Sequence, residues 1–484
     1  MKKYFLVVAS FFIYSHISLG QVYPGQMDST FVPVRSHHYD PELTFDFCVN
    51  EPAWSNQAGI HSAFGSTDRL YFRKEVPVNH DNDLSSSYST TVWRGERANA
   101  QILVWSSEAL EQVRVSTQDL RSAEGNIIPK DRITFELVRY VLSNYPYAEK
   151  KAICGESPYK SGFLMPDRFE TLDRFDLPSQ TTRPVWMLVD VPRGTAPGTY
   201  KGQVEVRAKG KAPQLLNLEI VVQNQLLPYP KDWKYRLDLW QNPWAVAWYN
   251  HVEPWSPEHK MLLKQHLKHY ADAGGTYITT YGVHSPWSDN SYMIEGGMIE
   301  WIKKADGTWA FDYKIFDEYV ELAMECGIDE AITLYTPIPW GFRHRYKDEA
   351  TGDYSYINWA PSSEEFKKMW NIFLTDFKFH LEAKSWLDIT YIGINENPME
   401  ETLAAINVVR NHDKCWKITY AGNWHKELDG LLDDYSFLYG EEPTIAEQKA
   451  RAATGRTSTY AVTRRSRTTS CSLLLSRDVG SVGM

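Results

Sequence analysis

The second half of the chain repeats one order of elements: a short apolar strand, a loop and then a helix. This alternation predicts a parallel sheet, because parallel strands need a long crossover between them. The number of units and the apolar strands favour a (β/α)8 TIM-type barrel over a doubly wound sheet. A nucleotide-binding fold is disfavoured because no glycine-rich phosphate loop follows the first strand. The six expected strands are 235–241, 276–284, 329–337, 388–396, 417–423 and 434–440.

The first half has a different pattern, in which short alternating strands are separated by turns. TTRPVWMLVDVP and GTYKGQVEVRA alternate apolar and polar residues, and the residues between them favour turns. We therefore expect a β-sandwich over residues 21–227, a linker around Pro228 and Pro230, and a barrel domain over residues 234–460. A chain of 484 residues is long enough for both domains.

The N-terminus has the pattern of a secretory signal. Residues 1–20 contain two lysines, a short apolar run and then small residues up to Gly20. We therefore expect a secreted or periplasmic protein with no membrane span. A formal net charge of -10 without a basic stripe argues against a nucleic-acid partner. The five cysteines are scattered, so we predict neither a disulfide framework nor a zinc site. We also expect no cofactor.

One acidic residue stands at the end of the fourth expected strand. The stretch ITYIGINENP changes from strand to turn at Asn395 and Glu396. A glutamate there is either a solvated loop charge or a carboxylate directed into a pocket. Active sites of α/β barrels lie where strands end and the next loops begin. We therefore take Glu396 as the candidate catalytic carboxylate.

Tryptophan is concentrated in the second half, with 14 of the 18 residues between positions 233 and 424. Packing of helices against a sheet explains those at helical spacing. Others directly follow expected strands, where a flat aromatic ring covers the apolar face of a sugar. We favour sugar binding for Trp287 and Trp340, and leave sugar binding and core packing equally open for Trp240, Trp244 and Trp424.

Polar residues at the same strand ends are candidates for binding sugar hydroxyl groups. His284 ends the second expected strand and Tyr335 the third, so both would line one mouth, and ligand contact is the favoured interpretation. Asn242 follows the first expected strand, and we place it among the residues expected to bind the sugar. Asn423 follows the fifth strand, where the roles of turn residue and of ligand contact stay equally open.

Together these stretches resemble glycoside hydrolase family 123, whose members are exo-acting β-N-acetylgalactosaminidases with an N-terminal β-sandwich and a (β/α)8 barrel. The resemblance covers most of the chain, from VWRGERANAQILVWS through LDLWQNPWAVAWY, PWSDNSY, DGTWAFDY, LYTPIPW and YIGINENP to KITYAGN. It implies a glycosidase that acts on β-linked glycans and needs no cofactor.

The resemblance also implies roles for two residues. In the family a glutamate after the fourth strand is the general acid/base, and Glu396 matches it. The preceding aspartate of the family holds the substrate's 2-acetamido group, whose oxygen attacks the anomeric carbon. This chain has Asn395 instead. A neutral amide orients the acetamido group but cannot stabilise its developing positive charge, so we expect reduced activity or another substrate.

Two other functions stay open. Asn-Glu at the end of a fourth strand is also typical of retaining β-glycosidases that act on non-acetamido sugars, where a second glutamate on the seventh strand is the nucleophile. No glutamate follows Glu447, which argues against this enzyme. A catalytically inactive, secreted glycan-binding protein is the non-enzymatic alternative, which Asn395 favours and Glu396 opposes.

The character of the sequence changes near residue 461. Four arginines (Arg464, Arg465, Arg467 and Arg477) appear without lysine among Ser and Thr, and no seventh or eighth strand is predicted. A disordered basic tail is one explanation. The other is a shifted reading frame, because the codons from Ala461 onward permit CNPPQPDNFLFSPAESRCWLGWY in the next frame, an aromatic sequence suited to complete a family 123 barrel. We therefore expect an incomplete barrel and a tail at residues 461–484, and we expect this chain to fold poorly and to have impaired activity.

Overall fold

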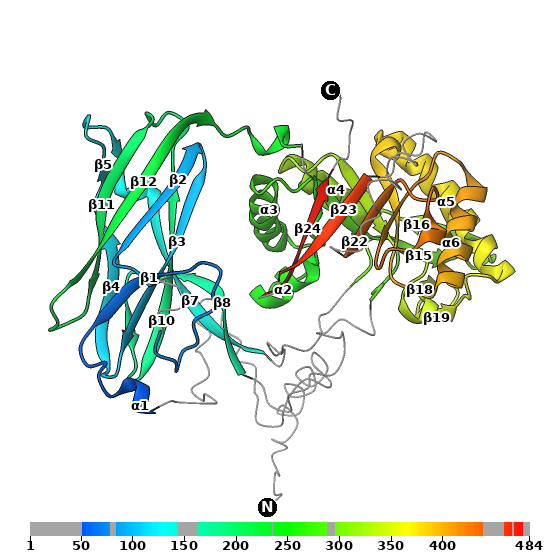
Figure 1. Cartoon of the computed structure of the whole chain (residues 1–484). Coiled ribbons are helices and arrows are strands. Elements are labelled where there is room, and N and C mark those ends of the chain that lie inside the picture. Colours follow the sequence, from blue (N-terminus) through cyan, green and yellow to red (C-terminus); the bar gives the residue numbers. More distant parts are fainter. Residues whose placement is uncertain are drawn as a thin grey trace, which may run out of the picture. The chain divides into compact units, whose positions relative to one another are not determined.

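The computed structural model describes residues 51–77, 84–143, 163–234, 236–287, 296–438, 459–466 and 469–477 (Figure 1). The signal peptide expected at residues 1–20 lies outside this part. The chain divides into two compact units, Asp40–Pro228 and Tyr229–Met484, the second grouped with Met1–Tyr39. Within the described residues, no helix combines the length and the apolar character that crossing a membrane requires.

The first unit contains two sheets and a short helix, α1 (Glu51–Trp54). The five-stranded sheet has the order β1 (His61–Gly65), β3 (Arg97–Ser106), β10 (Thr181–Asp190), β7 (Ile133–Ser143) and β8 (Phe163–Thr171). The seven-stranded sheet has the order β2 (Ser87–Arg94), β12 (Gln214–Leu226), β11 (Gly198–Arg207), β4 (Leu110–Thr117) and β9 (Phe175–Leu177), with β5 (Leu120–Arg121) beside β11 and β6 (Ile127–Ile128) beside β5.

Both sheets contribute to a single hydrophobic core. Every second residue of β12 is buried from Leu216 to Val222, and the same core contains Ile102 and Val104 of β3 from the other sheet. Alternation of buried and exposed residues is what a strand needs when one face is covered and the other is not. Two sheets with a shared core are the arrangement of a β-sandwich.

The second unit is built on an eight-stranded sheet. Its strands, in spatial order, are β13 (Arg236–Leu237), β24 (Thr469–Arg477), β23 (Thr459–Ser466), β22 (Asp434–Leu438), β21 (Lys417–Ala421), β20 (Thr390–Ile394), β17 (Ala331–Tyr335) and β14 (Tyr277–Tyr281). The helices of this unit are α2 (Pro243–Asn250), α3 (Pro257–Asp272), α4 (Lys314–Glu325), α5 (Glu364–Lys384) and α6 (Met399–His412).

The predicted (β/α)8 barrel is not confirmed. Neighbouring strands from β14 to β23 are parallel, but β24 is antiparallel to both β23 and β13. A single parallel bridge between Leu237 and Gly275 links the two ends of the sheet. Only residues 467 and 468 separate β23 from β24, a connection that suits a hairpin and is too short for a parallel crossover.

Two further expectations differ from the structure. The first strand, expected over residues 235–241, is only the two-residue β13. The region after residue 461, where we expected no further strand, contains most of β23 and all of β24. In Figure 1, β23 lies beside β22 and β24 lies on the other side of β23. These strands were not predicted, because this arginine-rich segment shows only a weak alternation of polar and apolar residues.

The two faces of the large sheet differ in chemistry. Register pairs Ile278 with Ile332 and Ile392 with Ile418 on one face, and all four belong to the core that α4, α5 and α6 cover. The opposite face carries smaller or polar residues. Thr279 pairs with Thr333 there, and Tyr335, Gly393 and Thr419 form a row across three neighbouring strands. The apolar face thus anchors the helices, and the polar face is left for the site.

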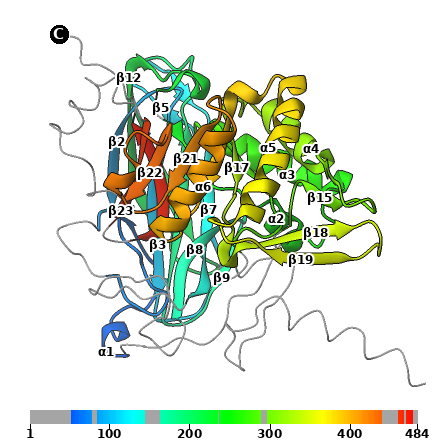
Figure 2. The ribbon, with the colours of Figure 1, turned by 90° about the vertical axis from the view of Figure 1, so that its right-hand side faces the viewer.

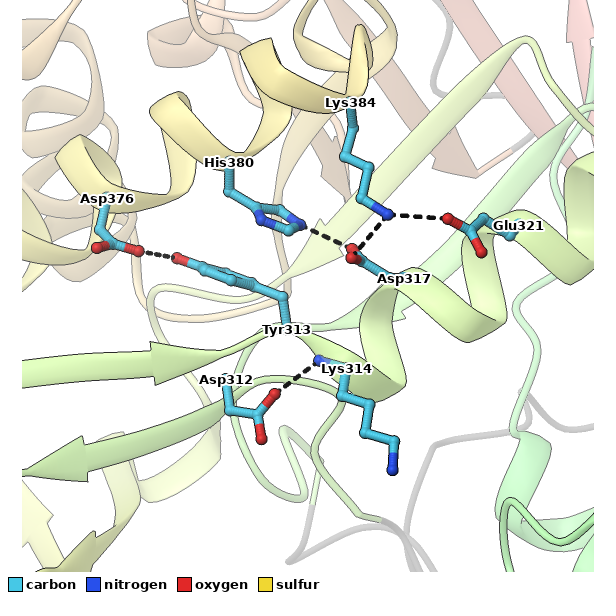
Figure 3. Close-up of polar contacts among 8 residues, drawn as sticks. All are labelled: Asp312, Tyr313, Lys314, Asp317, Glu321, Asp376, His380 and Lys384. Carbon is cyan, nitrogen blue, oxygen red and sulfur yellow. Dashed lines mark hydrogen bonds and ion pairs between the residues drawn. The ribbon is translucent and has the colours of Figure 1, made fainter.

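A polar network joins α4 to α5 on the helical side (Figure 3). Asp317 accepts from His380 Nε2 at 2.7 Å and pairs with Lys384 at 2.9 Å. Tyr313 donates to Asp376 at 2.7 Å, and its ring stacks on His380 with centroids 4.0 Å apart. Burial, reinforced by Asp376, raises the pKa of Tyr313. The network fixes the two helices and does not contact Glu396.

A four-stranded sheet is formed by segments that follow β14 and β17. Its order is β16 (Trp309–Asp312), β15 (Glu300–Lys303), β18 (Arg343–Asp348) and β19 (Tyr354–Asn358). Figure 2 shows β18 and β19 as a long hairpin. Both insertions start at the carboxyl ends of strands of the large sheet, the edge at which parallel α/β proteins place their active sites.

Candidate active site

Glu396 stands two residues beyond the end of β20 and three before the start of α6. The buried strand Thr390–Ile394 fixes the backbone, and Pro398 before α6 ends the loop. The residue is exposed, yet surrounding protein atoms desolvate its carboxyl group and raise its pKa above the ordinary value. Burial and then the charge of Glu396 raise the pKa of Tyr420 to about 12. A carboxyl group with a raised pKa suits a general acid.

Asn395 is 1% exposed and held from two sides. The orientation of its amide is assigned from its hydrogen bonds. The NH2 group faces the carbonyl oxygen of Ile338 at 2.7 Å, and the side-chain oxygen accepts from Trp340 Nε1 at 3.3 Å. Asn397 Nδ2 donates to the same Ile338 oxygen at 3.0 Å. Asn395 and Trp340, both predicted from the sequence, are therefore in direct contact.

Three of the predicted aromatic residues form one cluster over β13, β14 and β17. Trp240 stacks on Trp287 with centroids 5.4 Å apart and planes at 17°. The ring of Tyr335 lies 5.2 Å from Trp240 and 5.1 Å from Trp287. Tyr335 is 1% exposed, whereas Trp240 is 43% exposed. Because the two indoles cover each other on one side, a sugar would stack on an outer face.

The loops after β14 and β17 are joined beside this cluster. The backbone N–H of Trp340 donates to the carbonyl oxygen of Pro286 at 2.9 Å. His284, two residues earlier, is partly buried, and burial followed by the charges of Arg345 and Arg343 lowers its pKa to about 4. His284 is therefore neutral at neutral pH and suits hydrogen bonding rather than charge pairing.

The other predicted residues have structural surroundings. Asn242 is the N-cap of α2, and its side chain accepts from the backbone N–H of Ala245 at 3.2 Å. The backbone oxygen of Asn423 accepts from Tyr435 at 2.8 Å, and its side chain is exposed. Trp424 packs partly buried against the core of the second unit. The capping bond gives the Asn242 side chain a structural role, and ligand contact by Asn423 and Trp424 stays a prediction.

Two buried carboxyl groups lie near the cluster and were missed from the sequence. Asp238, directly after β13, is 9% exposed, and burial and then the charge of Asp434 raise its pKa to about 7. A hydrogen bond from Trp240 partly offsets this shift. Asp434 begins β22 and accepts from Thr419 at 3.2 Å. Asp238 lies inside the first strand expected over residues 235–241, so its position in the sequence did not mark it as a site residue.

The assembled residues have the chemistry of a sugar-cleaving site. A carboxyl group with a raised pKa supplies a proton, and neighbouring indole rings offer a surface for a pyranose ring. Within the described ranges, no group of three or more His, Cys, Asp or Glu side chains is arranged to hold a metal ion.

Comparisons with known proteins agree with this chemistry. The glycoside hydrolase 123 catalytic domain matches residues 240–473, and the glycoside hydrolase 123 N-terminal domain matches residues 64–208. A search of curated proteins gave no match.

Solved structures were also compared. A family 123 glycoside hydrolase from Clostridium perfringens, studied for glycolipid glycan hydrolysis, aligns with a TM-score of 0.72 and 24% identity. The alignment covers 84% of this chain and 72% of that one. A family 39 glycoside hydrolase from Bacteroides cellulosilyticus WH2 aligns over 68% of this chain and 56% of that one, with 13% identity and a TM-score of 0.25, too low to indicate a shared fold. The two domain matches, in the order that the family has them, show that this chain is a member of glycoside hydrolase family 123.

Proposed function

We propose that the protein is a glycosidase that releases N-acetylgalactosamine from the ends of β-linked glycans. Family membership supports a glycosidase, and the resemblance of its motifs supports this sugar. The observation that carries the proposal is Glu396, whose desolvated carboxyl group follows β20 with a raised pKa. A glycosidase needs such a group to protonate the leaving oxygen.

In the proposed reaction the substrate supplies its own nucleophile. The oxygen of the 2-acetamido group attacks the anomeric carbon while Glu396 gives its proton to the leaving glycosidic oxygen. Glu396, now a carboxylate, then takes a proton from the water that opens the oxazolinium intermediate. The sugar's configuration is retained, because the anomeric carbon is attacked twice, once from each face.

Asn395 has the role of orienting the acetamido group. The Ile338 carbonyl and the Trp340 indole hold the side-chain amide of Asn395 in one position, so this amide has little freedom to reorient. Its lack of charge limits the stabilisation of the positive charge that develops on the acetamido nitrogen. We propose that the enzyme is slower than a homologue with aspartate, on the order of 100-fold.

The natural substrate and the location are parts of the same proposal. The Clostridium perfringens relative is described in terms of glycolipid glycans, so glycans of this class are the first to test. The pattern of residues 1–20 supports export, so the enzyme would act in the periplasm or outside the cell.

A glycosidase for non-acetamido sugars is the second candidate, and Asn395 favours it. In such enzymes the amide next to the acid/base binds a 2-hydroxyl group. An inactive glycan-binding protein is the third candidate and retains only the aromatic cluster.

One paired assay separates these candidates. Purified protein and its Glu396→Gln variant are assayed on an aryl β-N-acetylgalactosaminide and on the matching aryl β-galactoside. The proposal predicts hydrolysis of the first substrate only. Hydrolysis of the galactoside alone supports the second candidate. Sugar affinity without turnover of either substrate supports the third.

A further inference from the structure

The hairpin of β18 and β19 has one face that the proposed reaction does not use. Register pairs Arg345 with Tyr356 and Lys347 with Tyr354, so these four side chains point to the same side. His344, on the other face, is buried. The tyrosines are 50% exposed at Tyr354 and 48% at Tyr356. Two large aromatic rings and several cations are therefore displayed together on the hairpin.

Each arginine on this side lies over a tyrosine ring. Arg343 Cζ is 4.0 Å from the ring centroid of Tyr356, and Arg345 Cζ is 4.1 Å from that of Tyr354. We call these four residues the Arg–Tyr face. Stacking holds a guanidinium group by its plane and leaves its N–H edge available, which is how arginine binds carboxylate, sulfate and phosphate groups.

The charge of the Arg–Tyr face is only partly balanced. Glu300 lies 3.7 Å from Arg345 and accepts a hydrogen bond from the Tyr354 hydroxyl at 2.8 Å. Within the residues that the structure describes, Arg343 has no carboxylate within ion-pair distance. The face thus keeps positive charge on a chain whose formal net charge is -10.

The Arg–Tyr face adjoins the candidate active site. Arg343 follows Trp340 by three residues, and the backbone N–H of Trp340 is bonded to Pro286, next to the loop of His284. Both arginines are close enough to His284 for their charges to lower its pKa, in addition to the larger effect of burial. A ligand held at the aromatic cluster could therefore extend onto the hairpin.

We propose that the Arg–Tyr face binds an anionic group, a carboxylate or a sulfate ester, on the part of the glycan next to the sugar that is released. This inference deepens the proposed function and rests on it. The stacked guanidinium edges bind the oxyanion, and the exposed tyrosine rings contact the sugar that carries it. The enzyme would then prefer acidic glycans over neutral ones with the same terminal sugar.

The test compares three disaccharide substrates with the same terminal β-N-acetylgalactosamine. The second sugar is neutral, carries a carboxylate or carries a sulfate ester. At low salt we expect kcat/KM at least about tenfold higher for one or both acidic substrates, because a charge-assisted contact contributes that much. The preference should shrink as salt is added.

Variants localise the effect. Arg343→Gln, and the double variant Arg343→Gln with Arg345→Gln, should lose the preference and hydrolyse the neutral substrate within about twofold of wild type. Lys304→Gln is the matched control, because it removes a cation next to β15 that pairs with Glu349 at 2.8 Å, away from the Arg–Tyr face. This control should keep the preference.

A binding measurement separates this inference from the proposed function. Calorimetry with the Glu396→Gln variant, whose turnover of disaccharides is strongly reduced, compares affinity for the neutral, carboxylated and sulfated disaccharides. Tighter binding of an acidic disaccharide, lost with Arg343→Gln, supports the Arg–Tyr face even where no substrate is hydrolysed. Equal affinity for all three, or a preference that survives the double variant, overturns it.

Discussion

The indole N–H of Trp340 lies 3.3 Å from the side-chain oxygen of Asn395, so the loop after β17 is tied to the end of β20. The two residues come from separate sequence motifs, LYTPIPW and YIGINENP. A change in either residue should therefore affect the position of the other.

Asn395→Asp should raise turnover of N-acetylgalactosaminides and leave galactosides unaffected. The new carboxylate would stabilise positive charge on the acetamido nitrogen, a gain on the order of 100-fold. One of its oxygens would face the Ile338 carbonyl, where the amide now lies 2.7 Å away, so the pKa of the new carboxyl group should rise. We expect the gain to increase with pH. An equal change on both sugars would show that residue 395 does not handle the acetamido group.

Glu396→Gln should lower the rate on an unactivated disaccharide by roughly 100- to 10,000-fold. The rate on activated aryl glycosides should fall less, since only poor leaving groups need a proton. The raised pKa of Glu396 also fixes the sign of a pH effect. As pH rises through that pKa, the carboxyl group loses its proton and kcat/KM of the wild type should fall. The variant should lack this alkaline decline. Full activity of the variant on the disaccharide would refute the assignment.

Gly393→Ala should disturb the aromatic cluster without unfolding the protein. Gly393 lies opposite Tyr335 in the sheet, and an added Cβ would come within 2.9 Å of the Tyr335 ring. The ring must shift, and with it Trp240 and Trp287, so we expect KM to rise by about tenfold. Gly194→Ala is the control, because a Cβ there meets nothing within 4 Å. Unchanged KM in the Gly393 variant would mean that Tyr335 does not position the cluster.

Much of the second unit was predictable because its strands are short, apolar and regularly followed by helices. The position of Glu396 and the meeting of Trp240, Trp287 and Tyr335 follow from one rule, that loops after parallel strands share an edge. The sequence could not separate a helix cap from a ligand contact at Asn242, since Asn serves both purposes. Asp238 was missed because its burial comes from residues distant in sequence.

The strands β23 and β24 of the large sheet were less predictable. Pairing between distant strands depends on register and on partners that local patterns do not specify. A hairpin at DGTWAFDY is predicted by its Asp-Gly turn and is confirmed as β15 and β16. The hairpin of β18 and β19 that carries Arg343 and Arg345, and its pairing with β15, were missed for the same reason, because they come from a separate insertion. The role of these arginines became visible only through their contacts.

We propose that residues from about Ala461 arise from a shifted reading frame. The reversed strand β24 supports this proposal, because it occupies a place where the family resemblance implies a parallel strand. Resequencing of the gene should reveal an open frame that continues through CNPPQPDNFLFSPAESRCWLGWY. This 484-residue chain should fold poorly and have impaired activity, and restoring the frame should raise its melting temperature and activity. A single frame without any shifted continuation, together with an active and cooperatively folding 484-residue protein, would contradict the proposal.

The central claim is that the 2-acetamido group of the substrate attacks the anomeric carbon while Glu396 protonates the leaving oxygen. It is tested most directly with aryl β-galactosaminides whose N-acetyl methyl group carries none, one, two or three fluorine atoms. Fluorine withdraws electrons and weakens the carbonyl oxygen as a nucleophile. The account predicts that log kcat/KM falls steadily along the series, by orders of magnitude in total. A flat series, or equal hydrolysis of the galactoside that lacks the acetamido group, would contradict it.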